Sequence, residues 1–478
     1  MPNPLDPAVR LDPAVRLDPA VRLDPAAPLN PAARFDPAAA LDPALRLDPA
    51  AWLDHTALRK LDEAIDDFAE DSFAFLERLV GAPSTVGREA PAQLIVRAEL
   101  ARLGFETSAM AIPDDIGQDL VAGIPQAPYQ GRDNMIGTLV SGDGPSLILN
   151  GHVDVVPAEA ELWSSPPFTP VRRDGWLFGR GAGDMKGGFA LATLAVAALV
   201  AAVPGWLRGR LTFASVIEEE CTGNGTLAAA RQGVLADAAV LLEPTDLGLL
   251  LGGVGILWAE LTVPGLPAHA ESAHRAINPV PMALRLIDSL QALEPEMAAA
   301  LDGPFAQLDH ACNVSVGVFR AGDWPSSVPG QATVGIRVGF PPAWTPGEAL
   351  RRVARAVHAA AAADPWLAEH PPSVRPAGFR AEGYLIDAEH PLVAALASAH
   401  AGAHGAPPRC FALGSTTDAR LYLNQFGIPA VAYGPRARNI HAADESVELA
   451  SIVAGARTLA RFLAGYYAAG GLRTGGAS

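Results

Sequence analysis

The amino-acid sequence predicts an α/β fold, in which a sheet covered by helices on both faces is interrupted by a smaller α+β domain. Three observations lead to this fold class. Apolar runs of strand length alternate with helical stretches up to about residue 253 and again after about residue 373. Between these segments, Ile256–Val263 alternates apolar and polar residues, as an antiparallel strand does. A chain of 478 residues is also too long for one ordinary core, so two or three domains are expected.

The N-terminal stretch repeats the unit L-D-P-A-V-R with drift, and a proline occupies every sixth position from residue 7 to residue 49. Each proline lacks a backbone donor and biases the Asp or Asn before it away from helical geometry, which excludes a continuous helix. We expect residues 1–60 to be a low-complexity tail that is disordered or polyproline-like. A repeat that binds a partner or drives assembly is the alternative.

The first part of the main domain is predicted to span residues 61–253. Its helices show amphipathic or apolar helical patterns, and its strands are short apolar runs bounded by glycine and polar residues. The predicted helices are Asp62–Gly81, Pro91–Leu103, Phe189–Ala202 and Gly225–Gln232. The predicted strands are Met135–Val140, Ser146–Asn150, Arg210–Val216 and Ala239–Leu242.

The inserted domain is predicted to span residues 254–372. Its elements are the strand Ile256–Val263, the helix Pro279–Ala292, the strands Cys312–Phe319 and Gln331–Phe340, and the helix Thr345–Ala362. This β-α-β-β-α order is typical of a ferredoxin-like domain. Residues 373–470 then resume the first pattern with a helix at Pro391–His404 and a strand at Ala430–Tyr433, and complete the main sheet.

The charge balance restricts the partners. The formal net charge is −17 and the sequence pI is about 5.1, which argues against nucleic acid or an anionic membrane as the main partner. The apolar stretch Phe189–Trp206 is mostly alanine and ends in Pro204-Gly205 without interfacial anchors, so we interpret it as a buried core helix and expect no membrane span. No signal-peptide pattern precedes the folded part.

The three cysteines, Cys221, Cys312 and Cys410, lie far apart in the sequence. Their spacing indicates neither a disulfide framework nor a structural zinc site. The natural location for such a chain is a reducing cytoplasm.

Candidate functional residues follow the predicted strands. The run Ser146–Pro157 places His152 and Asp154 two residues apart at the end of a buried strand, so both side chains point the same way. Asp184 lies in the glycine-rich run Gly179–Gly188, before the apolar helix, where it caps that helix or serves a site. An imidazole with a nearby carboxylate is what a catalytic metal site requires.

Three further elements continue the pattern. Glu218, Glu219 and Glu220 follow a buried strand, where adjacent negative charges repel one another unless a cation neutralises them. Glu243 and His441 follow two other predicted strands. The carboxyl ends of strands form the ligand-binding edge of open α/β sheets. Two imidazoles and three carboxylates at this edge match a site for two divalent metals that share one carboxylate.

In this order, the runs H-V-D, G-R-G-A-G-D-M-K-G-G, E-E-E, L-E-P-T and I-H-A-A-D-E resemble the M20 metallopeptidase family. The similarity is greatest to its acetylornithine deacetylase and succinyl-diaminopimelate desuccinylase members, and it covers about Leu61 to Tyr467. The resemblance implies a zinc-peptidase-like mixed sheet and identifies the ferredoxin-like insert as a lid and dimerisation domain.

The resemblance also implies two divalent metal ions, zinc in the first place, with cobalt or manganese as alternatives. His152, Asp184 and Glu243 would hold one ion, and Asp184, Glu220 and His441 the other. Asp154 would orient His152. A cis peptide bond is implied between Asp184 and Met185.

The general base is one of the consecutive glutamates. Family members commonly read Asp-Glu-Glu, which makes Glu219 the base and Glu220 the ligand. Some relatives have one residue more before the following glycine, and that register would give these roles to Glu218 and Glu219. The first register is our prediction.

The resemblance assigns substrate contacts to His269, Arg337 and Thr416. His269, in G-L-P-A-H-A, would reach the active site of the partner in a homodimer and stabilise the oxyanion. Arg337 would bind a substrate carboxylate, and Thr416, in G-S-T-T-D-A-R, would be a further contact. The sequence departs from those relatives at Ser326, where they carry an asparagine. The resemblance therefore does not imply that the substrate is the one of the desuccinylases.

The implied function is a di-zinc amidohydrolase that removes an acyl group from an N-acylated amino acid or a similar small amide bearing a carboxylate. Three alternatives remain open: a dipeptidase or carboxypeptidase of the same family, an enzyme for other amides such as formylaminopyrimidines, and a catalytically silent dimeric binding protein.

Overall fold

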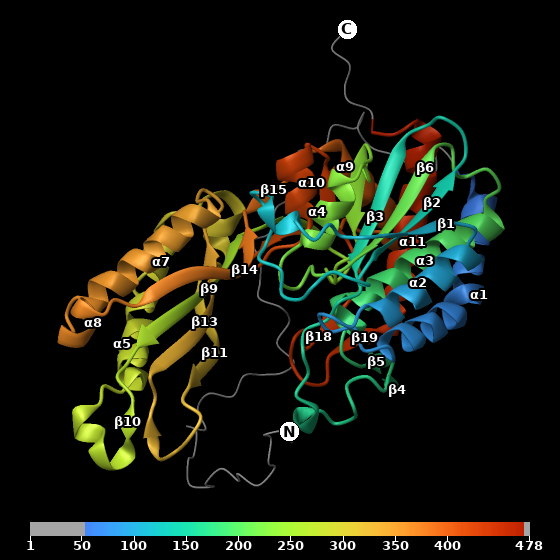
Figure 1. The fold of residues 1–478 in the computed structure, drawn as a ribbon. Coiled ribbons are helices and arrows are strands. Elements are labelled where there is room, and N and C mark those ends of the chain that lie inside the picture. Colours follow the sequence, from blue (N-terminus) through green and yellow to red (C-terminus); the bar gives the residue numbers. More distant parts are fainter. Residues whose placement is uncertain (1–52, 473–478) are drawn as a thin grey trace. The chain divides into compact units, whose positions relative to one another are not determined.

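The computed structural model describes residues 53–472, and Figure 1 shows their arrangement. The predicted repeat tail lies outside these residues up to position 52. The first helix, α1, spans His55–Val80 and so begins before the expected Asp62. It starts there because the Asp54 side chain accepts a hydrogen bond from the amide of Ala57, a typical N-cap.

The main sheet has nine strands in a mixed arrangement, as the predicted fold class requires. Along the main path the order is β1, β2, β6, β3, β7, β17, β8 and β15, with β16 also paired to β8. These strands are β1 (Glu106–Met110), β2 (Asn134–Val140), β3 (Ser146–His152), β6 (Arg210–Val216), β7 (Ala238–Leu241), β8 (Leu249–Gly253), β15 (Tyr384–Leu385), β16 (Cys410–Leu413) and β17 (Ala430–Ala432). The central strands β6, β3 and β7 are parallel, so their carboxyl ends meet at one edge.

Alternate residues of a strand point to opposite sides of the sheet, and here both sides carry apolar residues. Helices therefore cover both faces of this sheet. Leu147 and Leu149 of β3 belong to one core and Ile148 to the other. The first core is built with α1, α2 (Ala90–Arg102), α3 (Gly187–Ala202), α9 (Pro391–His404) and α11 (Leu449–Ala469). The second core includes residues of α4 (Asn224–Arg231) and α10 (Ala419–Phe426).

The apolar helix α3 is a core helix. By length and composition alone, the stretch Ala182–Ala202 would suffice to cross a membrane, but 83% of its most apolar window is buried inside the protein. Helix α3 packs between α1 and α11, and its alanines allow the close approach that this requires.

The inserted domain contains a four-stranded sheet in the order β11, β13, β9 and β14. These strands are β9 (Gly255–Pro264), β11 (Val314–Ala321), β13 (Gln331–Phe340) and β14 (Ser373–Ala381). Helices α5 (Pro279–Gln291) and α7 (Pro346–Ala361) pack against it. Because β14 pairs with β9, the sheet of the inserted domain extends past the predicted boundary at residue 372, and its last strand completes a β-α-β-β-α-β ferredoxin-like order.

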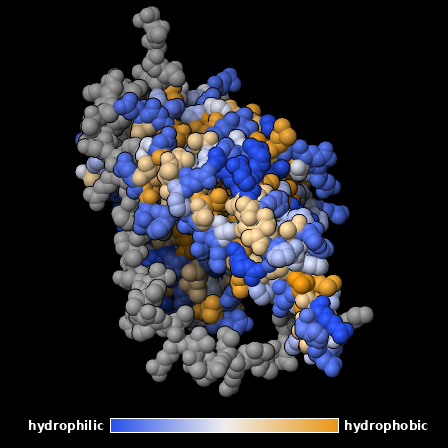
Figure 2. Space-filling view, turned by 90° about the vertical axis from the view of Figure 1, so that its left-hand side faces the viewer, coloured by the Kyte–Doolittle hydropathy of each residue, from blue (hydrophilic) through white to orange (hydrophobic). Residues whose placement is uncertain are grey.

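The remaining elements are short. A small sheet pairs β18 (Ala437–Arg438), β19 (Ser446–Glu448), β5 (Trp176–Phe178) and β4 (Val171–Arg173). In the inserted domain, β10 (Ala268–His269) pairs with β12 (Ser327–Val328), and α6 (Glu294–Ala299) and α8 (Pro365–Glu369) are its remaining α-helices. In the space-filling view of Figure 2, apolar residues gather in small patches separated by hydrophilic ones.

Candidate metal centre

The carboxyl edge of the main sheet gathers the predicted site residues. His152 is the last residue of β3, Glu218–Glu220 follow β6, and Glu243 follows β7. Since these three strands are parallel neighbours, their last residues meet at one place. Asp184 and His441 arrive on loops from elsewhere in the chain.

His152 is buried and lies among carboxylates. Its Nε2 atom lies 3.2 Å from Asp184 Oδ1, and 3.9 Å from both Glu219 Oε2 and Glu243 Oε2. On the other side of the ring, Nδ1 lies 2.9 Å from the backbone oxygen of Asp154 and 3.7 Å from its Oδ1. Contact with the carbonyl favours the tautomer whose proton sits on Nδ1, which leaves Nε2 free to act as a ligand.

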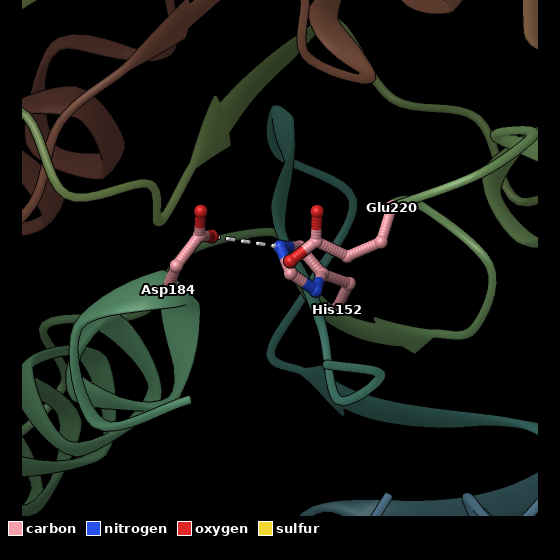
Figure 3. A group of neighbouring side chains, drawn as sticks. All are labelled: His152, Asp184 and Glu220. Atoms are coloured by element: carbon pink, nitrogen blue, oxygen red, sulfur yellow. Dashed lines mark hydrogen bonds and ion pairs between the residues drawn. The ribbon is translucent and has the colours of Figure 1, made fainter. Parts of the chain in front are cut away.

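His441 lies near Glu220 and also near Asp184, the carboxylate that it shares with His152. Its Nε2 lies 3.0 Å from Glu220 Oε2 and 3.5 Å from Asp184 Oδ2. The two oxygens of Asp184 therefore face two different imidazoles. Figure 3 shows Asp184, His152 and Glu220, with the contact between Asp184 and His152 drawn as a dashed line.

Asp184 lies in the turn Ala182–Lys186, which leads into α3 and whose backbone is not helical at Asp184 and Met185. The peptide bond between Asp184 and Met185 is cis, as the family resemblance implied. Behind the loop, the buried Lys186 ammonium donates to the carbonyls of Leu79 and Ala82, at and just beyond the end of α1. The turn is thus attached to the first helix.

The three consecutive glutamates face different surroundings. Glu218 is buried away from the imidazoles, where its carboxylate lies 2.9 Å from Arg132 Nη1 and accepts a hydrogen bond of 2.7 Å from Tyr129 Oη. The amides of Glu219 and Glu220 both donate to the Asp154 carboxylate, at 3.3 and 3.1 Å. Asp154 therefore contacts both the His152 ring and the backbone of the glutamate turn.

The electrostatics are those of a crowded anionic site. Burial raises the pKa of Glu243 to about 8, His152 opposes this, and Asp184 adds to it. Burial also raises the pKa of Glu219. Burial disfavours the charged ring of His441, but the carboxylates of Glu220 and Asp184 raise its pKa to about 11. Carboxylates held this closely favour a positive charge among them.

The donor set fits divalent metal ions. One ligand atom each from His152, Asp184 and Glu220 lie within 4.8 Å of one another. Imidazole nitrogens and carboxylate oxygens are the donors that zinc and related divalent ions take in catalytic sites. Glu243 and His441 add one carboxylate and one imidazole beside this group, as the distances above show.

The three predicted substrate contacts lie outside this cluster. Arg337 is on β13 of the inserted domain, where its guanidinium donates to Asn313 Oδ1 (2.8 Å) and to the Gly414 carbonyl (3.1 Å). Burial lowers the pKa of Arg337. Thr416 is two residues beyond Gly414, and its hydroxyl is buried without a hydrogen-bond partner within the described chain.

His269 is exposed on β10, and its Nδ1 accepts from the backbone amide of Glu271. It is not among the side chains that surround His152 in the described part of the chain.

Sequence reasoning missed two buried arginines near the cluster. Arg132 pairs with Glu218 and with Glu89, and Arg180 pairs with Glu445. For Arg180 the available signal was an arginine within a glycine-rich run, whereas the polar residues around Arg132 offered none. The partner of either arginine could not be found by pattern, because it lies 43 residues away for Arg132–Glu89 and 265 residues away for Arg180–Glu445.

The fold and the donor cluster define an α/β protein with a candidate site for divalent metal ions. Residues 148–465 match the sequence pattern of peptidase family M20/M25/M40. The chain is 32% identical over 408 residues to a succinyl-diaminopimelate desuccinylase from Methylobacterium sp. (strain 4-46), a match that covers 83% of this chain and 96% of that protein. The chain therefore belongs to the M20 family and is a hydrolase of amide bonds.

Solved structures share the fold. The di-peptidase Dug1p from Saccharomyces cerevisiae matches with a TM-score of 0.73 at 16% identity, covering 86% of this chain and 98% of that one. Human carnosine dipeptidase 1 matches with a TM-score of 0.69 at 17% identity, covering 85% and 98%. The M20 family metallo-carboxypeptidase Sso-CP2 from Sulfolobus solfataricus matches with a TM-score of 0.63 at 16% identity, covering 82% and 98%.

Proposed function

We propose that the protein removes an acyl group from an N-acylated amino acid, or from a similar small amide bearing a carboxylate, with the help of two divalent metal ions. The observation that carries this proposal is the placement of Asp184 between His152 and His441, with Glu219 beside them. The 32% identity to a desuccinylase favours deacylation. Dipeptide hydrolysis is the second candidate, because dipeptidases share the fold.

The residues present would hold two ions through a shared carboxylate. His152, Asp184 and Glu243 would bind one ion, and Asp184, Glu220 and His441 the other. Zinc is our first choice, with cobalt or manganese as alternatives. When bound, such ions acidify water and polarise the scissile carbonyl.

Glu219 is our candidate for the general base. Its carboxylate is buried and lies 3.9 Å from His152 Nε2, whereas Glu218 is occupied by Arg132 and Tyr129. It would take a proton from the attacking water and return it to the leaving amine. Burial raises the pKa of Glu219, which suits a group that must hold a proton between these two steps. Asp154 would keep His152 in its orientation.

The substrate carboxylate would be bound by Arg337, supported by Thr416. The Arg337 guanidinium is largely buried, and among the described residues it contacts only neutral oxygens, from Asn313 and Gly414. A buried guanidinium without a carboxylate partner favours an anionic ligand. The partnerless hydroxyl of Thr416 lies on the Gly414 loop and would supply a further hydrogen bond.

We further propose a homodimer through the lid, in which His269 of one protomer would stabilise the oxyanion in the other. Support comes from β11, an edge strand of the lid sheet that is mostly exposed and carries partly exposed Val316, Val318 and Phe319. Exposed apolar edge strands pair readily with another strand.

The three cysteines are buried and free, which suits a reducing cytoplasm.

A hydrolysis screen of the metal-loaded protein tests the function. N-acetyl, N-succinyl and N-formyl amino acids are compared with dipeptides, each with and without chelator, and free amine is measured. We expect chelator-sensitive release from acylated amino acids. Release from dipeptides alone would favour the second candidate. Binding of two metal ions without turnover of any compound would leave a silent binding protein.

The base assignment is tested by Glu219→Gln. We expect the turnover number to fall at least about 100-fold, the typical contribution of a general base, with metal content unchanged. The exposed Glu63→Gln on α1 is the control and should leave turnover unchanged. Turnover retained in Glu219→Gln would contradict the assignment.

A further inference from the structure

Glu445 is a buried carboxylate that contacts the backbone of the Asp184 loop. Its side chain is 1% exposed. Its Oε1 atom accepts hydrogen bonds from the amides of Gly183 and Asp184, both at 2.9 Å. The approach is close: a Cβ atom added to Gly183 would lie 3.3 Å from this same oxygen and 2.8 Å from Ala437 Cβ. The carboxylate thereby fixes the backbone from which the Asp184 side chain projects.

The other oxygen of Glu445 accepts from a buried arginine that reaches two further loops. Arg180 Nη1 donates to Glu445 Oε2 at 2.5 Å. Its Nη2 donates to the backbone oxygen of His441 at 3.3 Å and to that of Pro157 at 3.5 Å. The Arg180 guanidinium is 3% exposed and lies over the Trp163 ring, 5.2 Å from its centroid. One ion pair therefore joins the loops of Asp184 and His441 and the segment that follows β3.

We propose that the Arg180–Glu445 pair is a positioning device that sets the distance between Asp184 and His441. The inference rests on the proposed metal-dependent function and adds two residues to it, neither of which contacts the substrate. Burying two charged groups costs hydration free energy that an apolar pair of similar volume does not lose. A buried ion pair therefore stabilises a core less effectively than apolar side chains do. Glu445 accepts hydrogen bonds from the loop of Asp184, and Arg180 donates one to the backbone of His441. We therefore assign this pair a geometric role.

A second arginine–carboxylate pair in the same domain, whose carboxylate is more exposed, provides a control. Arg461 donates to both oxygens of Asp62, at 2.9 and 2.7 Å, and joins α11 to α1. These contacts lie between two helices and involve none of the ligand-bearing loops. Loss of this pair removes an arginine–carboxylate contact of the same chemistry without touching the Asp184 loop.

The test is a Co²⁺ titration of the full-length metal-free protein, followed by its visible absorption spectrum, for Glu445→Ala, Glu445→Gln, Arg180→Lys and Asp62→Asn. Substitution of a residue that supports a ligand typically costs 10–100-fold in metal affinity. We expect a loss of about 10–100-fold and an altered spectrum in Glu445→Ala. Glu445→Gln should recover part of the loss, because its amide oxygen still accepts from the loop. Asp62→Asn should bind Co²⁺ within about twofold of wild type.

The outcomes separate this inference from the proposed function. If wild type binds two Co²⁺ ions and the Glu445 and Arg180 variants match its affinity and spectrum, the positioning role is refuted. An equal loss in Asp62→Asn would also refute it, since the effect would then reflect general stability. If wild type binds no Co²⁺, the proposed function itself fails. Should Glu445→Ala not fold, as judged by circular dichroism, Glu445→Gln and Arg180→Lys decide the question.

Discussion

At the scale of single residues, the backbone assigns three identical side chains to different environments. Glu218 adopts a positive φ of 61°, which is uncommon for a residue other than glycine. Its carboxylate turns toward Arg132 and Tyr129, while the next two amides donate to Asp154. The first glutamate is then a buried anchor, and the other two face the imidazoles. This geometry supports the register in which Glu219 is the base and Glu220 a ligand.

Glu218→Gln is expected to lower the stability of the metal-free protein, whereas Glu219→Gln is not. Glu218→Gln removes charge from a buried contact of Arg132, which keeps its pairing with Glu89, so a loss of about 1–3 kcal/mol follows. Glu219→Gln replaces a carboxyl group whose charged form burial already disfavours, so it should not destabilise the metal-free protein.

Urea unfolding of the metal-free proteins measures both effects, and an activity assay completes the comparison. Glu218→Gln should retain measurable turnover, whereas Glu219→Gln should not. The reverse pattern of activity would move the base to Glu218 and establish the alternative register.

At the scale of elements, α9 carries two histidines that face its neighbours. His400 Nδ1 lies 3.1 Å from Tyr433 Oη, and the His400 and His404 rings are 4.4 Å apart. His404 in turn lies 3.0 Å from Thr458 Oγ1 on α11. The charged groups that act on His404 are Arg461 and Arg457 of α11 and Asp62 of α1.

This packing makes the contribution of His400 to stability dependent on pH. Burial, together with His404, lowers the pKa of His400 to about 4, against about 6.5 in an unfolded chain. Between these two pH values the unfolded chain binds a proton at His400 that the folded protein does not. The contribution of the neutral His400 ring to stability is therefore complete above about pH 6.5 and is lost as the pH falls towards 4.

We expect the drop in melting temperature between pH 7 and pH 5 to be about 2–4 °C smaller in His400→Gln than in wild type. The exposed His310→Gln is the control and should follow wild type. An equal drop in melting temperature in wild type and in His400→Gln would show that the His400 ring does not cause the pH dependence of stability. Differential scanning calorimetry at both pH values makes the measurement.

At the scale of the whole molecule, the proposed site is incomplete within one chain if His269 acts in a partner. Neither Glu219→Gln nor His269→Ala should then be active alone. Mixing the two variants forms dimers in which one site has both groups intact. Random exchange makes half of the dimers mixed, with one of two sites restored, so about a quarter of wild-type activity should return.

Light scattering and an activity assay after subunit exchange make this measurement. Val318→Lys in both variants places a charge on the exposed edge of β11 and should prevent both dimer formation and recovery. A monomeric wild type, or mixing that restores no activity, would contradict the arrangement.

Much of the architecture was predictable because its signals are local. The apolar periodicity predicted β6 over Arg210–Val216 and the buried helix α3, and both are present. Short strands such as β8 were missed, since a few apolar residues beside glycines carry little periodicity. The boundary at residue 372 was misplaced because β14 belongs to the sheet of the inserted domain through pairing with β9, more than a hundred residues earlier in the chain.

The sequence by itself determined the fold class, the family, and the residue types at the strand ends, because each is written in short runs whose order along the chain is sufficient. Only the tertiary structure decided which glutamate faces the imidazoles and which buried charged groups pair with one another. Those depend on contacts such as Arg132 with Glu218 and Arg180 with Glu445. Partners distant in sequence meet only when the chain folds, so no local pattern encodes them.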